Sequence, residues 1–377
     1  MNILVTGGAG FIGSWLIDSL AKAGHEVTVL DSLSAQVHGQ IPRIAVDWPC
    51  LDRGVKFVRS DIRDTLAMDE ALANADAVVH LAAETGTGQS MYRIAHYYDV
   101  NHQATAAMFE AIATRHRNVK KIVLASSRSI YGEGAYMSGD TMIVPAPRNP
   151  ERLKLGLFEP LGPAGEPLNL MATPEHAPPF PASIYAATKL ANESLGRIFA
   201  EAYLTQVVAL RFQNVYGDRQ SLHNPYTGIL SIFSNRMRQG LPINIFEDGQ
   251  ESRDFVHVSD VVRGIELSLT TELPKFCVMN IGSGVPTSVL DVAEKLRALL
   301  KSDSLLQITG DFRSGDIRHC FADLTLAKQL LGLVPEVSLD AGLAAFCDWV
   351  RTQPVSEDRS SQAQLELSRV GLGKSSK

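Results

Sequence analysis

The chain has 377 residues, 45% of them hydrophobic and 20% charged, with a formal net charge of −6. These values are ordinary for a soluble globular protein, and the length allows a large core and two coupled lobes. The acidic balance gives no global field to attract nucleic acid or an anionic membrane. A few local cations must therefore hold any anionic ligand.

Other bulk features narrow the class of protein further. No apolar run is long enough to cross a membrane, and no signal-peptide pattern precedes the first predicted strand. The four cysteines share no CxxC spacing, which disfavours a metal site or disulfides and is typical of free thiols in a reducing compartment. We expect no metal, no membrane partner and a cytoplasmic protein.

The first thirteen residues predict a site for the pyrophosphate of a dinucleotide. Residues 2–6 read as a buried strand, and apolar residues recur at helical spacing from Phe11 onward. Between them, Gly8 would permit a tight turn, Gly10 would let the backbone approach the phosphates, and Gly13 would let helix and strand pack closely. The N-terminus of the helix would then face the anion.

A second predicted strand, residues 26–30, ends at Asp31. An acidic residue roughly 20 positions past the glycines accepts hydrogen bonds from the adenosine ribose hydroxyls and repels a 2′-phosphate. Asp31 therefore favours NAD over NADP, although a simple turn at the end of a strand would look the same.

Further strands are predicted over residues 55–58, 77–80, 121–125 and 206–212, and they alternate with helices. This alternation indicates an α/β protein with a Rossmann-type doubly wound parallel sheet, in which ligands bind at the carboxyl ends of the strands. The loop ETGTGQS, residues 84–90, leaves one of these ends and is either a ligand-binding segment or a surface turn.

Two predicted helices carry polar residues of interest. A long helix following Ser90 and running to about residue 116 would place Tyr98 and Asn101 on one face. Ser183 reads as the N-cap of a second helix, which would place Tyr185 and Lys189 on one face because they are four residues apart. Taken alone, the YxxxK pattern often means surface packing. His80, within a predicted strand, is better explained as a packed core histidine than as a catalytic one.

The remaining segments predict a second lobe, an insertion and a tail. Residues 132–182 are rich in proline and glycine, and read as a long insertion that is a lid, a contact surface or partly mobile. Shorter strands and helices after residue 218 predict a smaller α/β substrate-binding lobe. We expect a Rossmann domain at 1–218 completed by about 255–283, a second lobe at 219–254 and 284–352, and a disordered tail at 353–377.

Short motifs occur in a specific order along the chain. They are TGGAGFIG at Thr6–Gly13, DIR at Asp61–Arg63, HLAA at His80–Ala83, Asn101, SSRSIYG at Ser126–Gly132, YAATK at Tyr185–Lys189, RFQNVYG at Arg211–Gly217, RDFVHVSD at Arg253–Asp260, NIGSG at Asn280–Gly284 and RSGDIRH at Arg313–His319. As an ordered set over about residues 1–350, they resemble the extended short-chain dehydrogenase/reductase family, specifically its nucleotide-sugar epimerase and dehydratase branch.

This resemblance implies a role for each matching residue. Ser127, Tyr185 and Lys189 would be catalytic. NAD would be bound by Gly7, Gly10, Phe11, Ile12, Gly13, Asp31, Asp61, Ile62, Leu81, Ala82, Ala83 and Asn101, together with Tyr185 and Lys189. The nucleotide-diphosphate sugar would be bound by Glu84, Thr85, Thr87, Ser127, Arg128, Asn214, Arg253, Arg313 and Asp316.

The resemblance also indicates a reaction. Dehydratases of this branch carry an Asp-Glu pair after the catalytic Ser or Thr, and here those positions are Arg128 and Ser129. This favours 4-epimerisation, and the 84–90 loop, the insertion and SSRSIYGEG look most like bacterial dTDP-L-rhamnose 4-epimerases. The alternatives are a UDP-sugar 4-epimerase, a nucleotide-4-ketosugar reductase and a non-catalytic NAD-binding regulator. The family commonly forms homodimers, here through the helix after Ser90 and the helix that carries Tyr185.

Overall fold

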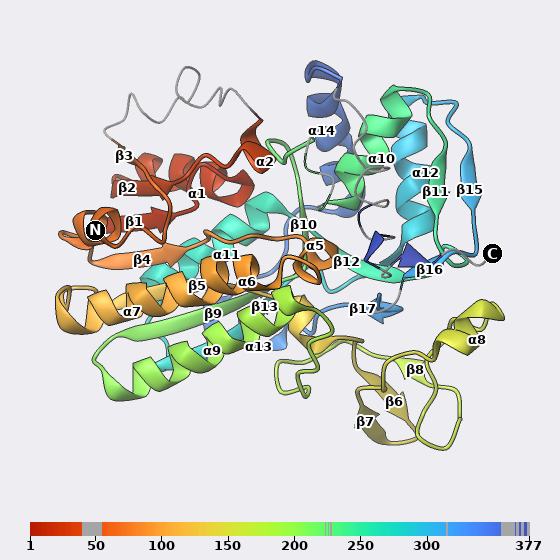
Figure 1. The fold of residues 1–377 in the computed structure, drawn as a ribbon, viewed down its shortest axis with the longest axis horizontal. Coiled ribbons are helices and arrows are strands. Elements are labelled where there is room, and N and C mark those ends of the chain that lie inside the picture. The colour runs from red at the N-terminus through yellow and green to blue at the C-terminus, as the bar shows by residue number, and fades with distance from the viewer. Residues whose placement is uncertain are drawn as a thin grey trace.

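The computed structural model shows a large parallel sheet flanked by helices, a smaller lobe beside it and a projecting insertion (Figure 1). The structure describes residues 1–39, 55–222, 224, 226, 228–313, 316–355, 366, 369, 370, 373 and 374, without the side chains of 313, 373 and 374.

Within the described residues, the main sheet has seven parallel strands in the order β13-β9-β5-β4-β1-β2-β3. Their bounds are β1 Asn2–Thr6, β2 Glu26–Asp31, β3 Lys56–Arg59, β4 Ala77–His80, β5 Lys121–Ser127, β9 Gln206–Phe212 and β13 Phe276–Ile281. The order reverses between β1 and β4, which is where such sheets bind ligands. The predicted fold class is confirmed.

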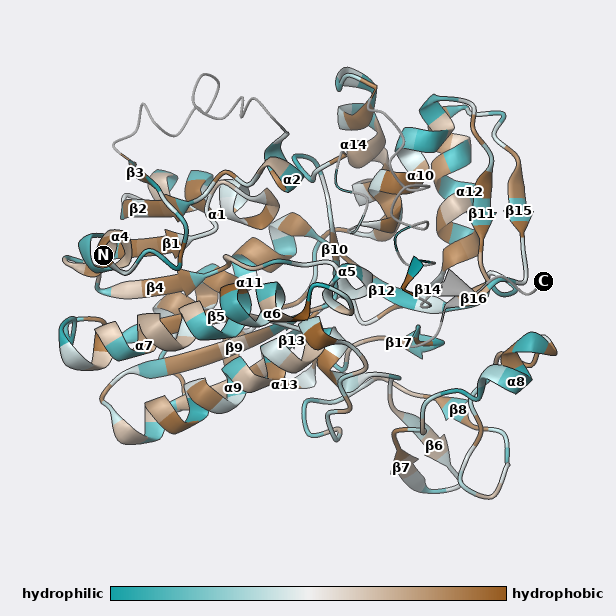
Figure 2. Cartoon of the chain, in the orientation of Figure 1, coloured by the Kyte–Doolittle hydropathy of each residue, from teal (hydrophilic) through white to brown (hydrophobic). Residues whose placement is uncertain are grey.

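Helices cover both faces of this sheet. One face carries α1 (Phe11–Lys22), α11 (Val258–Thr270) and α13 (Thr325–Leu331), and the other carries α4 (Thr65–Leu72), α7 (Ala104–Thr114) and α9 (Ile184–Ala202). The strands between them are buried on both sides, and Figure 2 shows much of β1, β4 and β9 in the hydrophobic colour. α13 packs on β13 of the main sheet, whereas residues 284–352, which include α13, were expected from the sequence to belong to the second lobe.

The second lobe packs helices around a core of its own. Its helices are α10 (Ile229–Arg238), α12 (Val289–Leu300) and α14 (Leu339–Thr352), with a small parallel pair β11 (Ile243–Ile245) and β15 (Leu306–Ile308). A mixed sheet joins this lobe to the Rossmann domain through β10 (Asn214–Tyr216), β12 (Ser252–His257), β14 (Pro286–Ser288) and β17 (His319–Cys320).

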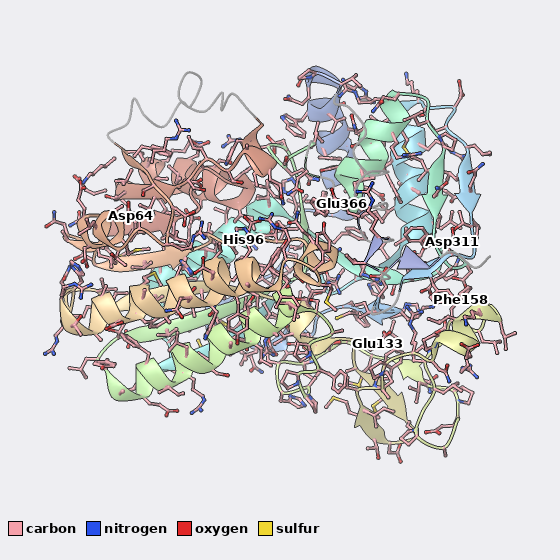
Figure 3. The ribbon with its side chains drawn as sticks, in the orientation of Figure 1. Asp64, His96, Glu133, Phe158, Asp311 and Glu366 are labelled. Atoms are coloured by element: carbon pink, nitrogen blue, oxygen red, sulfur yellow. The ribbon has the colours of Figure 1, made fainter. Side chains whose placement is uncertain are left out.

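The insertion folds into a small antiparallel sheet of β6 (Tyr136–Ser138), β7 (Thr141–Ile143) and β8 (Asn169–Leu170). The short helix α8 (Pro150–Lys154) lies between β7 and β8 in the chain. A buried ion cluster ties the insertion to the second lobe. Arg148 lies 3.2 Å from Glu133 and 2.8 Å from Glu247, and Arg318 lies 3.0 Å from Glu247. Figure 3 shows Glu133 where the insertion meets this lobe. The described part of the insertion therefore packs against the second lobe.

The region expected to be a disordered tail is described only in part. Gly373–Lys374 form β18, which pairs with β16 (Phe312–Arg313), and the Glu366 carboxylate contacts two tyrosines described below. For these residues the expectation was wrong, because backbone pairing and carboxylate hydrogen bonds hold them against the body. The others between 356 and 377 lie outside the described residues, apart from Arg369 and Val370.

The predicted long helix after Ser90 is interrupted. It consists of α5 (Thr87–Ser90), α6 (Ile94–Tyr98), a π-helical turn over Asp99–Gln103 and α7. The π turn shifts the register, so Tyr98 is 45% exposed while Asn101 is 1% exposed. The expectation that these two residues share one face was therefore wrong, because it assumed a continuous α-helix.

Candidate active site

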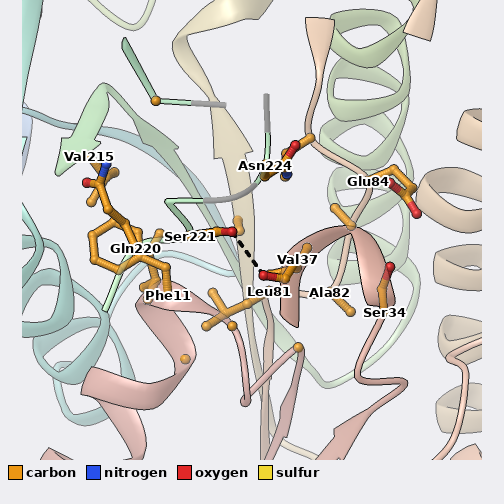
Figure 4. Close-up of a pocket in the computed structure, with 18 of the residues that line it drawn as sticks. Phe11, Ser34, Val37, Leu81, Ala82, Glu84, Val215, Gln220, Ser221 and Asn224 are labelled. Atoms are coloured by element: carbon orange, nitrogen blue, oxygen red, sulfur yellow. Dashed lines mark hydrogen bonds between the residues drawn. The ribbon is translucent and has the colours of Figure 1, made fainter. Parts of the chain in front are cut away.

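A cavity of about 780 Å³ lies at the carboxyl ends of β1, β4 and β5 and is closed on its other side by the second lobe. Figure 4 shows residues of both walls. The predicted site residues that line the cavity are Gly7, Gly10, Phe11, Ile12, Gly13, Asp31, Asp61, Ile62, Leu81, Ala82, Ala83, Glu84, Thr85, Thr87, Ser127, Arg128, Tyr185, Lys189 and Asn214.

The glycine turn forms one end of this cavity. Gly7 has φ 69°, and a Cβ there would lie 2.6 Å from the backbone nitrogen of Ala82. Gly7 rather than Gly8 therefore makes the tight turn, which corrects the sequence prediction. A Cβ at Gly13 would lie 2.5 Å from the Gly7 carbonyl oxygen, so the expected close packing of helix on strand is present. Gly10 provides no capping side chain, which leaves the first N–H groups of α1 for an anion.

Asp31 lies at the next strand end and is held by the backbone. Its carboxylate accepts hydrogen bonds from Ala9 N at 2.9 Å and Leu33 N at 2.8 Å, and only 8% of the residue is exposed. Backbone donors favour the charged form of a carboxylate. A fixed negative charge at this edge fits a ribose with free hydroxyls and opposes a 2′-phosphate.

Two elements bring the predicted catalytic residues together. Ser127 ends β5, and Tyr185 and Lys189 lie in the first turns of α9, whose N-cap Ser183 accepts a hydrogen bond from Ala186 N at 3.1 Å as predicted. Lys189 Nζ lies 5.8 Å from the centre of the Tyr185 ring and donates to the Ala125 carbonyl at 2.7 Å.

Burial governs the charge states in this group. It raises the pKa of Tyr185, while a hydrogen bond from Ser127 and the positive charge of Arg128 act in the opposite direction. Burial also lowers the pKa of Lys189 to about 8. Ser127 and Arg128 thus partly offset the effect of burial on Tyr185. A phenol in such a site can act as a base, which is the chemistry required to remove a proton from a sugar hydroxyl.

The comparisons with known proteins agree with this geometry. The model of the NAD dependent epimerase/dehydratase family matches residues 3–151 and 161–282. The chain belongs to this family. It is 38% identical over 352 residues to the dTDP-L-rhamnose 4-epimerase of Burkholderia thailandensis, covering 93% of this chain and 94% of that protein. The predicted family, an isomerase that uses NAD, is confirmed.

Solved structures of family members share the fold. The UDP-glucose 4-epimerase of Thermotoga maritima with UDP-glucose has a TM-score of 0.74 and 30% identity, covering 93% of this chain and 99% of that one. The UDP-glucuronic acid 4-epimerase of Bacillus cereus, in complex with UDP-glucuronic acid and NAD, has a TM-score of 0.74 and 28% identity over the same shares. No helix among the described residues is long and apolar enough to span a membrane.

Asn101 does not line the cavity, although the family pattern suggested that it lies near the cofactor. Its Oδ1 accepts from Glu84 N at 2.8 Å, and its Nδ2 donates to the Glu84 carbonyl at 3.0 Å and to Thr188 Oγ1 at 3.2 Å. Asn101 therefore fixes the start of the 84–90 loop against α9. Asn101 lies within the π turn described above.

The second-lobe residues also differ from expectation. Arg253 does not line the cavity, because its guanidinium donates to the carbonyls of Ser252, Ile317 and Arg318 at 2.7–2.9 Å. Asp316 is exposed and does not line it either. The side chain of Arg313 lies outside the described residues.

Several lining residues were missed by sequence reasoning. His96 Nε2 lies 3.2 Å from a Glu84 carboxylate oxygen. The short helix α2 (Ala35–His38) lies across the cavity, where the Val37 carbonyl accepts from Ser221 Oγ at 2.9 Å (Figure 4). No local signal marks these residues, because distant chain segments bring them to the site. His80 is a packed core histidine, as predicted: its ring nitrogens hydrogen-bond Thr6 at 2.7 Å and Thr105 at 2.9 Å.

Proposed function

We propose that the protein is an NAD-dependent 4-epimerase that interconverts dTDP-L-rhamnose and dTDP-6-deoxy-L-talose. The observation that carries the proposal is the convergence of Ser127, Tyr185 and Lys189 on one cavity, with no carboxylate at the two positions after Ser127. A dehydratase needs an acid there to eliminate water. The likeness to the dTDP-L-rhamnose 4-epimerase of Burkholderia thailandensis supports the choice of sugar nucleotide.

The residues of this chain have separate tasks in the proposed reaction. Tyr185 takes the proton from the C4 hydroxyl, and Ser127 hydrogen-bonds the same oxygen. Lys189, fixed by the Ala125 carbonyl, favours the phenolate of Tyr185. When bound, NAD supplies reversible hydride exchange at C4. The 4-keto sugar then turns over and would take the hydride back on its other face, while Tyr185 returns the proton to the C4 oxygen.

The glycine turn, the start of α1 and Asp31 would hold the cofactor, which fits the observations on this wall of the cavity. Gly7 and Gly13 leave no room for side chains beneath the pyrophosphate. Because the cofactor is regenerated in each turnover, it should stay bound. The contacts of α2 across the cavity support retention: Gln36 and Gln89 exchange hydrogen bonds at 3.2 and 3.1 Å.

The test is incubation of the purified protein with dTDP-L-rhamnose, UDP-glucose, UDP-glucuronic acid and a GDP-sugar, with NMR of the products. Inversion at C4 of dTDP-L-rhamnose at the highest kcat/KM is expected. A UDP-sugar preferred over dTDP-L-rhamnose would instead support the second candidate, a UDP-sugar 4-epimerase, which the two structural neighbours favour. Absence of any C4 inversion would reject both, and stoichiometric NAD(P)⁺ formation with a ketosugar would indicate a reductase.

The proposed assembly is a homodimer through α6, α7 and α9. Apolar side chains on this side are exposed, among them Ile94 at 51% and Ile198 at 57%. Burial of such residues between two copies would stabilise a four-helix bundle. Sedimentation should show a dimer, and Ile198→Glu should shift it to monomer.

A cytoplasmic location stays a proposal that the free thiols of Cys277, Cys320 and Cys347 support, while Cys50 lies outside the described residues.

A further inference from the structure

Arg128 occupies an unusual electrostatic position in the cavity. It follows Ser127 directly, in the short 3₁₀ turn Arg128–Tyr131, and its side chain lines the cavity. Its Nε donates to Asn214 Oδ1 at 2.9 Å. Among the described residues, neither a carboxylate nor any other acceptor lies within bonding distance of its Nη1 and Nη2.

The other cations near the cavity are already committed. Arg63 binds Asp61 at 2.9 Å and Asp99 at 2.7 Å. Lys189 donates to a carbonyl, and the guanidinium of Arg253 is turned to three carbonyls. Among the described side chains, Arg128 is thus a cavity-lining arginine whose terminal donors have no bonded acceptor.

Elsewhere in the protein, buried arginines have carboxylate partners. Arg148 and Arg318 bind Glu247, and Arg211 binds Glu193 at 2.8 Å. In contrast, burial and the like charge of Arg253 lower the pKa of Arg128 to about 10. It stays protonated at neutral pH. Asp316 acts on this pKa in the opposite direction but makes no ion pair with Arg128. A buried cation beside a like charge, with no carboxylate bonded to it, is destabilising unless a ligand supplies that charge.

We propose that Arg128 binds an anionic oxygen of the substrate at the junction between the diphosphate and the sugar, and so acts as a specificity residue. Arg128 Nε donates to Asn214 Oδ1, and this hydrogen bond orients the guanidinium. Asn214 Nδ2 is then left as a second donor to the anionic oxygen of the substrate. Charged donors that pair with phosphate or carboxylate make the strongest hydrogen bonds in a site. This inference rests on the proposed function.

The anionic oxygen has two possible sources, the phosphate next to the sugar or a carboxylate on the sugar. Titration calorimetry of the NAD-loaded protein distinguishes them with dTMP, dTDP, dTDP-L-rhamnose and UDP-glucuronic acid as ligands. The variants are Arg128→Gln, Arg128→Lys and, as a matched control, Arg115→Gln, an exposed arginine outside the cavity. Thermal melts check that each variant is folded.

We expect Arg128→Gln to weaken dTDP binding roughly 10- to 100-fold. Binding of dTMP, which lacks the second phosphate, should change little, and Arg128→Lys should recover part of the loss. Loss confined to UDP-glucuronic acid would also support the inference and assign the oxygen to a carboxylate. Unchanged binding of dTDP and UDP-glucuronic acid, or equal losses for dTMP and dTDP, would overturn it. Since no turnover is measured, a failure of the proposed 4-epimerisation would be seen separately.

Discussion

The two walls of the cavity hold their charged side chains in different ways. On the Rossmann wall, Asp31 is fixed by the backbone nitrogens of Ala9 and Leu33, and its carboxylate still lines the cavity. On the second-lobe side, Arg253 is fixed by backbone carbonyls and does not line it, while Arg318 is enclosed by carboxylates.

This difference shows that an arginine in a substrate-binding lobe can be a structural group. The cluster around Arg318 joins the second lobe to the insertion, and its charges are largely satisfied within the protein. The cation that we propose to face the ligand is Arg128, which lines the cavity from the Rossmann wall. Four experiments would break or sharpen this comparison.

The largest effect is expected on the Rossmann wall, from Tyr185→Phe. Loss of the base should lower kcat by roughly 10³-fold, because general base catalysis contributes about 10²–10⁴. NMR of the sugar product measures it, and bound NAD should be unchanged. Tyr203→Phe, at the exposed end of α9, is the control and should keep full activity. A Tyr185→Phe enzyme with more than a tenth of wild-type kcat would contradict the assignment.

On the second-lobe side, Arg318→Gln should destabilise the protein. It removes the 2.7 Å partner of Asp248 and leaves Glu247 with Arg148 alone, and breaking a buried ion cluster costs about 3–5 kcal/mol. Urea unfolding measures the loss. The matched control Arg351→Gln removes an exposed pair and should cost at most about 1 kcal/mol. Equal midpoints for the two variants would mean that the cluster is not structural.

A smaller effect, which depends on pH, is expected from Lys189→Met. Burial lowers the pKa of Lys189 from 10.5 to about 8. Between pH 8 and 10.5 the lysine is therefore protonated in the unfolded chain but neutral in the folded protein. At about 1.36 kcal/mol per unit, the charged lysine costs the folded state about 3 kcal/mol at pH 7. The inactive variant should therefore be the more stable one at pH 7. Its advantage should shrink as pH rises from 8 to 10.5, and a gap independent of pH would contradict the buried charge.

The smallest effect concerns a contact between the two lobes that involves Glu366. The Glu366 carboxylate accepts hydrogen bonds from Tyr92 at 2.7 Å and Tyr226 at 2.5 Å. A double-mutant cycle of Glu366→Gln and Tyr226→Phe should give a coupling of about 1 kcal/mol in urea unfolding, the usual value of one such bond. Strict additivity of the two substitutions would show that this contact contributes nothing.

Much of the Rossmann half could be predicted because its signals are local. The bounds of β1, β4, β9 and α9 match the predicted ones, since each is an apolar run or a capped amphipathic helix. The π turn at Asp99–Gln103 could not be predicted, because it depends on the contacts of Asn101 with Glu84 and Thr188. The sequence likewise could not show that Gly7 rather than Gly8 makes the tight turn. The constraint on Gly7 comes from the backbone of Ala82, which is far away in the chain.

The sequence by itself determined the family, the anion-binding start of α1 and the spacing that places Tyr185 and Lys189 on one helix face. These features rest on neighbours within a turn of helix or a strand. Only the tertiary structure decided which cations reach the substrate. Arg253 and Arg128 look alike in sequence, but one meets the carbonyls of Ile317 and Arg318 and the other meets Asn214. The direction of a long side chain is set by partners that folding brings from elsewhere in the chain.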